Sequence, residues 1–157
     1  MPRGGWRLFA IAAGMTLSLG ARAACLPDSF PEHWLEAQER QGGHTLAQHV
    51  GKSDQQLLER LNRDKRLREE SSFADLDTAE SAVATALQRN RAGIESWAAH
   101  AKPRQRHAWH YRSDTALGHG AYRPAGRSHI AERRSVTTVM IKNADGSCTL
   151  FTAYPSR

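Results

Sequence analysis

The order in which helix and strand signals follow one another constrains this fold more than any other feature of the sequence. Helix patterns occupy the chain up to about residue 100, and strand patterns occupy the part that follows. Helices first and antiparallel strands later are typical of an α+β domain. We therefore expect N-terminal helices packed on an antiparallel sheet.

The helix signals are capping residues and apolar spacing. Ser53 followed by Gln56 is the pattern of a capping box. Asp77 with Glu80 repeats this start signal before the longest apolar stripe. The expected helical segments are residues 31–41, one or two turns within residues 44–51, a helix after Ser53, and a longest helix over roughly residues 78–99.

Strand signals dominate the last third of the chain. The expected strands are residues 107–112, 135–142 and 148–154, the last two joined into a hairpin by a turn at residues 143–146. Between the first strand and this hairpin, turn-forming residues predict an irregular basic stretch: Gly118, Gly120, Pro124 and Gly126.

The first 23 residues have the composition of a targeting segment. Arg3 and Arg7 precede an apolar run at residues 8–19, and an A-x-A cleavage signal follows at residues 21–23. The apolar run is too short to span a hydrocarbon core roughly 30 Å thick. We expect export to the periplasm or the exterior, and cleavage that leaves residues 24–157 as one domain without membrane association. An uncleaved membrane anchor is the alternative.

Cys25 and Cys148 are the two cysteines of the sequence. In an exported protein an isolated pair is most simply a disulfide. The bond would join the start of the expected domain to its last strand. Neither cysteine lies in a catalytic pattern, so we expect a structural role.

Charge is unevenly distributed along the chain. Residues 24–99 hold 9 Lys and Arg against 13 Asp and Glu, whereas residues 100–134 hold 8 against 2, together with five of the eight histidines. This basic block is either a binding surface for a polyanion or a solvated loop. Base stacking and core packing are both open for its aromatic residues, Trp109, Tyr111 and Tyr122.

Missing motifs exclude several classes of enzyme. The sequence has no G-x-S-x-G elbow, no P-loop and no dinucleotide fingerprint. His44 and His49 are five positions apart, about 140° around a helix, so they do not share a ligand face. His107 and His110 are three apart, which places them on opposite faces of a strand. We therefore expect neither a metal nor another cofactor.

The remaining polar residues can support metal-free acid–base chemistry. Cleaving RNA through its own 2′-hydroxyl requires a base, an acid, and donors that hold a negatively charged phosphorane. Histidine suits the first two roles, and arginine and paired hydroxyls suit the third. His49 precedes a helix that carries Arg60, and Thr152 and Tyr154 are two apart on the last strand. These residues alone leave a non-catalytic binder of RNA or another polyanion open.

Three segments of the chain resemble one known family. Residues 42–61 (GGHTLAQHVGKSDQQLLERL), 77–90 (DTAESAVATALQRN) and 150–155 (LFTAYP) look like the RNase A-like toxin domain of bacterial contact-dependent growth-inhibition proteins. The resemblance covers residues 42–155. Its specific part is the G-G-H-T-x-x-x-H-V-G opening motif together with the T-A-Y-P closing motif.

The resemblance implies a kidney-shaped α+β fold and metal-free transesterification of RNA to a 2′,3′-cyclic phosphate. It places the catalytic histidine in the opening motif, at His49 with His44 in reserve. The basic residue of the family then falls at Arg60, eleven positions after His49. The closing motif supplies Thr152 and Tyr154.

The resemblance also implies partners. RNA is the expected substrate, and Lys52 is a candidate contact to its phosphates. A toxin would require a cognate immunity protein, whereas a scavenging ribonuclease would not, and the sequence leaves both roles open. A catalytically inactive family member that acts through protein contacts is a further alternative. We expect a monomer.

Overall fold

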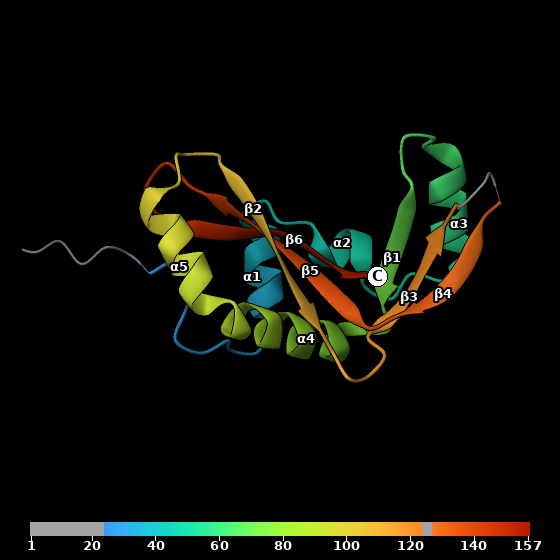
Figure 1. Cartoon of the computed structure of the whole chain (residues 1–157), viewed down its shortest axis with the longest axis horizontal. Coiled ribbons are helices and arrows are strands. Elements are labelled where there is room, and N and C mark those ends of the chain that lie inside the picture. Colours follow the sequence, from blue (N-terminus) through green and yellow to red (C-terminus); the bar gives the residue numbers. More distant parts are fainter. Residues whose placement is uncertain (1–23, 124–126) are drawn as a thin grey trace, which may run out of the picture.

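The computed structural model describes residues 24–123 and 127–157. The expected targeting segment, residues 1–23, lies outside these residues, as do Pro124 and Gly126. The elements, drawn in Figure 1, are α1 Trp34–Arg40, α2 Thr45–His49, α3 Asp54–Arg63, β1 Glu69–Phe73, α4 Leu76–Arg89, α5 Arg91–His100, β2 Arg106–Arg112, β3 Gly118–Tyr122, β4 His129–Arg133, β5 Ser135–Lys142 and β6 Cys148–Ser156. None of the helices in the described part of the chain has the length and apolar character that crossing a membrane requires.

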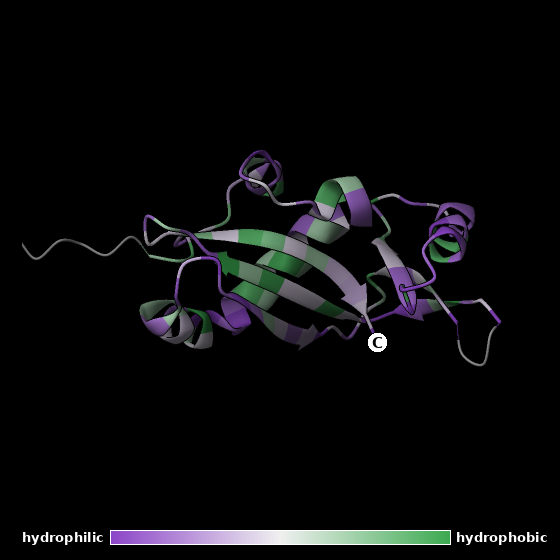
Figure 2. Cartoon of the chain, turned by 90° about the horizontal axis from the view of Figure 1, so that it is seen from above, coloured by the Kyte–Doolittle hydropathy of each residue, from purple (hydrophilic) through white to green (hydrophobic). Residues whose placement is uncertain are grey.

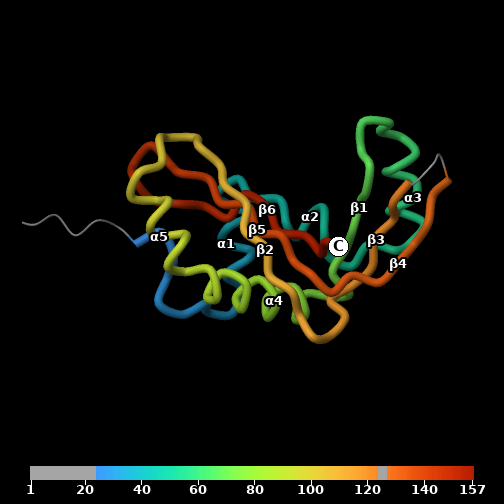
Figure 3. The backbone as a smooth tube through the Cα atoms, viewed as in Figure 1, coloured from blue at the N-terminus to red at the C-terminus, as the bar shows by residue number. Residues whose placement is uncertain are grey.

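The strands form two antiparallel three-stranded sheets, in the orders β2-β5-β6 and β1-β3-β4. Figure 1 shows the sheets on opposite sides of the molecule, with α4 and α5 along the first sheet and α3 beside the second. The tube in Figure 3 shows that the chain ends between the two sheets. This arrangement confirms the expected α+β fold.

The main core lies between α4 and one face of the β2-β5-β6 sheet. Val83 and Leu87 of α4 belong to the same buried cluster as Val136 and Met140 of β5, and Figure 2 shows hydrophobic colours along the strands of this sheet. Burying each such side chain contributes roughly 1.5–3 kcal/mol. A separate small cluster joins α3 to β3: Leu57, Leu61 and Ala121.

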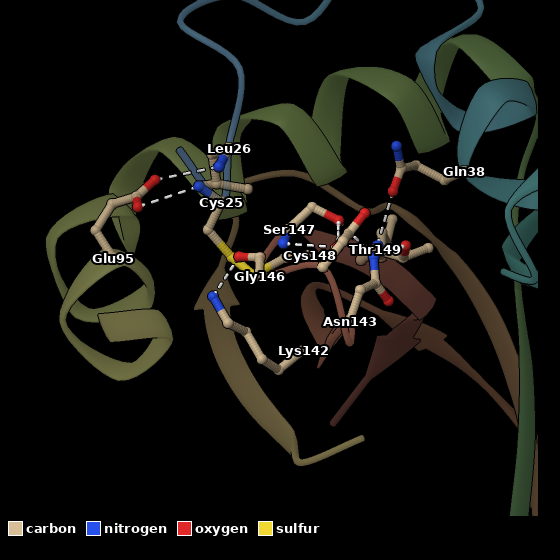
Figure 4. The surroundings of a disulfide bond; sticks show 12 residues. Cys25, Leu26, Gln38, Glu95, Lys142, Asn143, Gly146, Ser147, Cys148 and Thr149 are labelled. Carbon is tan, nitrogen blue, oxygen red and sulfur yellow. Dashed lines mark hydrogen bonds between the residues drawn. A yellow bond between two sulfur atoms is a disulfide. The ribbon is translucent and has the colours of Figure 1, made fainter. Parts of the chain in front are cut away.

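The expected disulfide between Cys25 and Cys148 is present. It ties the start of the described chain to the first residue of β6, and Figure 4 shows Glu95 of α5 beside it. The Glu95 carboxylate accepts hydrogen bonds from the backbone N–H groups of Cys25 at 3.2 Å and Leu26 at 3.1 Å. On the loop-entropy model, a cross-link with a sequence separation of 123 contributes up to about 5 kcal/mol.

One of the two helix starts predicted from capping residues is observed, and the other is not. The capping box before α3 is formed as predicted, with reciprocal hydrogen bonds between Ser53 and Gln56 at 2.8 and 3.2 Å. The start predicted at Asp77 is wrong, because α4 is capped by Asp75, whose carboxylate accepts a backbone N–H of the first turn at 2.8 Å. The single long helix predicted here is two helices, α4 and α5, which meet at Asn90.

The stretch predicted to be irregular contains two strands, β3 and β4, which is a second correction. A Cβ at Gly118 would overlap the carbonyl oxygen of Ser72 on β1, and a Cβ at Gly120 would lie 2.7 Å from Arg133 Nε. These glycines therefore allow close approach within a sheet and do not mark turns. The partner strand β1 was not predicted either.

Candidate active site

The chain between α1 and α2 docks on the edge of β6. His44 donates its backbone N–H to Phe151 O at 3.1 Å, and the hydroxyl of Thr45 accepts the N–H of Ala153 at 2.8 Å. Gly43 has no room for a side chain, because a Cβ would lie 2.7 Å from a backbone oxygen of β6. The opening and closing motifs are therefore in direct contact.

A pocket of about 270 Å³ lies where α2, α3, β1 and β6 meet. Figure 1 shows α2 between β6 and β1, at the junction of the two sheets. The five residues predicted to be catalytic all line this pocket, together with four that the sequence does not single out. The lining residues are His44, His49, Arg60, Leu67, Glu69, Glu70, Ser71, Thr152 and Tyr154.

His49, the last residue of α2, is buried in this pocket. Its Nδ1 lies 2.9 Å from Ser71 O, and because a carbonyl oxygen only accepts, Nδ1 donates the proton and Nε2 is the basic nitrogen. Burial lowers the pKa of His49 to about 4; the hydrogen bond to Ser71 opposes this shift, and the charge of Arg60 adds to it. His49 is therefore neutral at pH 7, which is the protonation state of a general base.

Glu70 connects Arg60 to His49. Its Oε2 lies 3.1 Å from Arg60 Nε, and its Oε1 lies 3.5 Å from His49 Nδ1. Arg60 also donates from Nη2 to Gln48 Oε1 at 2.8 Å, so its guanidinium is held on two sides. The Glu70 side chain is 4% exposed, and burial raises its pKa while the charge of Arg60 opposes that shift. No motif pointed to Glu70, because its position depends on β1, which local patterns did not predict.

β6 presents Thr152 and Tyr154 on one face, as their spacing predicts. The ring centre of Tyr154 lies 5.4 Å from that of His49. Thr152 Oγ1 is buried and has no hydrogen-bond partner within residues 24–123 and 127–157. An unpaired buried hydroxyl costs about 1–3 kcal/mol. A ligand oxygen in the pocket would supply the hydrogen-bond partner that Thr152 lacks.

His44 supplies the second imidazole of the pocket. Its ring centre lies 6.5 Å from that of His49 and 4.5 Å from that of Phe151, which it meets edge-on. Burial lowers the pKa of His44, the nearby Glu39 opposes this shift, and the charge of Arg60 adds to it. The pocket therefore combines two imidazoles, a fixed guanidinium and two hydroxyls.

Residues 43–155 match the family model described as the bacterial CdiA-CT RNAse A domain. The chain belongs to this family. Among solved structures, a chain of the CdiA-CT/CdiI complex from Y. kristensenii 33638 matches with a TM-score of 0.63 and 24% sequence identity, covering 73% of this chain and 100% of that chain. This likeness shows a common fold. No curated protein sequence matches. Membership in the CdiA-CT RNase A family supports a ribonuclease toxin role.

The other candidates of this CdiA-CT RNase A domain lie outside the pocket. Lys52 lines a neighbouring hollow of about 260 Å³, which shares Arg60 with the pocket. Trp109 and Tyr111 pack against the main core, and Tyr122 lies 5.5 Å below a guanidinium of β4. Within the described residues, no group of three or more His, Cys, Asp or Glu side chains is placed to hold a metal ion.

Proposed function

We propose that this chain is a metal-independent endoribonuclease that cleaves RNA by attack of a 2′-hydroxyl on the adjacent phosphate. The products are a 2′,3′-cyclic phosphate and a free 5′-hydroxyl. One observation carries the proposal: α2, α3 and β6, which are far apart in the sequence, bring His44, His49, Arg60, Thr152 and Tyr154 to one pocket.

His49 is the general base of the proposed reaction. Its Nε2 accepts the 2′-hydroxyl proton, while the hydrogen bond from Nδ1 to Ser71 O fixes the ring and its tautomer. The low pKa of His49 keeps the base unprotonated. A bound phosphodiester places a negative charge beside the ring, which raises this pKa and strengthens the base when substrate is present.

Arg60, Thr152 and Tyr154 stabilise the phosphorane. Glu70 and Gln48 hold the guanidinium of Arg60 before substrate arrives, so little reorganisation is needed as negative charge develops. Thr152 offers a hydroxyl without a partner among the residues described. Tyr154 offers a second hydroxyl two residues along the same strand.

His44 is the general acid in this scheme and gives its proton to the leaving 5′-oxygen. Its ring centre is 6.5 Å from that of His49, so one phosphate in the pocket can contact both imidazoles. The charge of that phosphate favours the protonated form of His44. One proton thus moves from the 2′-oxygen to His49, and another moves from His44 to the leaving oxygen.

Digestion of RNA in the presence of EDTA tests the proposal. The purified protein should cleave RNA and leave cyclic phosphate ends, and His49→Ala should abolish cleavage with an unchanged circular-dichroism spectrum. His100→Ala is a matched control, because His100 is exposed and its Nδ1 also bonds to a backbone carbonyl, Ser96 O, at 2.9 Å. Activity that survives in His49→Ala but is lost in His44→Ala would show that His44, and not His49, is the general base. Salt-dependent binding without cleavage would instead make the chain a polyanion binder.

We also propose that the chain is exported, with residues 1–23 removed, and that a cognate immunity protein inhibits it. The disulfide is consistent with an oxidising compartment, and the similar solved structure is a CdiA-CT/CdiI complex. Mass spectrometry of protein recovered outside the cytosol should give a chain that begins at Ala24. A chain that keeps its first 23 residues would contradict export by cleavage.

A further inference from the structure

The sheet face that carries Thr152 and Tyr154 continues to the outer strand of the β2-β5-β6 sheet. The strand register places Tyr154 opposite Thr137, and Thr137 opposite His110. Side chains directly opposite each other in antiparallel strands lie on the same face. His110 therefore shares the catalytic face with Tyr154, at a distance of two strand spacings, or about 10 Å.

The side chains of β2 differ between its two faces. Trp109 and Tyr111 pack with the main core on the side of α4. Arg106, His110 and Arg112 alternate with them and are exposed on the opposite, catalytic face. Strand alternation thus divides this part of the basic block: its aromatic residues pack in the core, and Arg106, His110 and Arg112 lie on an exposed sheet face.

Two contacts hold His110 and Arg106 of this basic row against the sheet. His110 Nδ1 lies 2.9 Å from Oγ1 of the buried Thr137. The guanidinium carbon of Arg106 lies 3.7 Å from the ring centre of Phe151, and the same ring packs edge-on against His44 of the pocket. The row is therefore continuous with the pocket and is not a separate surface.

We propose that the RNA strand runs from the pocket across this face, where Arg106, His110 and Arg112 contact the phosphates that adjoin the scissile one. The inference rests on the proposed ribonuclease function and adds a second subsite to it. Basic side chains on one face of a strand form a line that can follow a sugar–phosphate backbone, and such contacts do not depend on the base sequence. The substrate of this subsite is single-stranded RNA longer than a dinucleotide.

A double variant, His110→Gln with Arg112→Gln, tests this path. The substrates are a dinucleotide with one phosphodiester bond and a longer single-stranded oligonucleotide, both assayed in EDTA. We expect kcat/KM for the oligonucleotide to fall about three- to tenfold more than that for the dinucleotide, with a shallower salt dependence. Arg112→Gln alone, which leaves the His110–Thr137 contact in place, should show a smaller difference in the same direction.

The matched control is His107→Gln with Arg89→Gln, because it removes the same side-chain types from the other side of the sheet. His107 is exposed beside Trp109, with their ring centres 4.4 Å apart, and Arg89 is exposed at the end of α4. Equal losses on both substrates, no loss, or the same difference in the control would overturn the subsite. Wild-type protein that cleaves neither substrate would overturn the ribonuclease proposal itself. That result differs from each of the three that would overturn the subsite alone.

Discussion

The two sheets of this molecule are stabilised in different ways. The β2-β5-β6 sheet packs on α4 through the main core and carries the disulfide. The β1-β3-β4 sheet shares a cluster of only three fully buried apolar residues with α3 among those described, and adds ion pairs such as that of Glu69 with Arg157 at 2.9 Å. Exposed ion pairs contribute about 0–1 kcal/mol. We therefore expect the second sheet to open more easily than the first.

The candidate active site lies across the boundary between these two regions. Thr152 and Tyr154 belong to the better-stabilised sheet, whereas Arg60 and Glu70 belong to α3 and β1. His49 bridges them through Ser71 on β1 and through its packing on Tyr154. Local opening of the second region would remove the guanidinium and leave the hydroxyls in place. Activity should therefore respond to the less stable region first.

Removal of the disulfide has the largest expected effect on stability. Cys25→Ser with Cys148→Ser should lower the free energy of unfolding by up to about 5 kcal/mol, measured by denaturant or thermal unfolding. Reduction of the wild-type disulfide should have the same effect. A double variant as stable as the oxidised wild type would show that the first region does not depend on the cross-link.

Leu61→Ala should destabilise the β1-β3-β4 region more than the β2-β5-β6 region. Leu61 is fully buried in the small cluster of α3 and β3, and its truncation should cost about 2–5 kcal/mol. We expect faster hydrogen exchange in β3 than in β5, and a loss of activity as Arg60 loses its position. Leu87→Ala is the control, because Leu87 is equally buried in the main core. Equal exchange patterns in both variants would contradict the comparison.

Acid should destabilise the fold through His49 at the boundary. Its pKa is about 6.5 in an unfolded chain and about 4 in the fold, so between these values the unfolded state binds the extra proton. The contribution of neutral His49 is present above pH 6.5 and is lost as the pH falls to about 4, by up to roughly 3 kcal/mol. Unfolding measured over this range should depend less on pH in His49→Gln. An unchanged dependence would show that His49 is not buried as described.

Glu70→Gln should have a smaller effect, confined to catalysis. The variant keeps the side-chain size but removes the charge that holds Arg60, and we expect about a tenfold lower kcat, or 1.4 kcal/mol. The loss should appear in kcat more than in KM, because the Arg60 guanidinium stabilises charge that develops in the transition state. Glu69→Gln, which changes the neighbouring carboxylate of the same pocket, is the control. An equal loss of kcat in Glu70→Gln and Glu69→Gln would contradict a specific role of Glu70 in holding Arg60.

Local patterns predicted the elements that depend on neighbouring residues. The capping box of Ser53 and the strand Ser135–Lys142 have the expected positions, because their hydrogen bonds and side-chain alternation are short-range. β1 was missed because Glu69–Phe73 lacks an alternating pattern and is ordered by pairing with β3. Gly118 was misread as a turn residue for the same reason, since only the distant Ser72 explains it.

In the candidate site too, local patterns predicted some residues, and others depend on contacts between distant parts of the chain. The two motifs contain four of the five predicted side chains that line the pocket, and Arg60 follows the opening motif by a fixed spacing, so all five lie in short segments. Glu70 and Ser71, which hold Arg60 and His49, belong to the strand that local patterns did not predict. The residues that orient the predicted ones are therefore visible only once the fold is known.

The bond between Cys25 and Cys148 makes folding depend on chemical surroundings. Thiols stay reduced in the cytosol and pair in oxidising compartments. The polypeptide reaches its full stability only after it meets an oxidant, and a larger fraction of it is unfolded before then. A ribonuclease with this bond is therefore least stable in the cytosol, the compartment that holds the transcripts and ribosomes of its own cell.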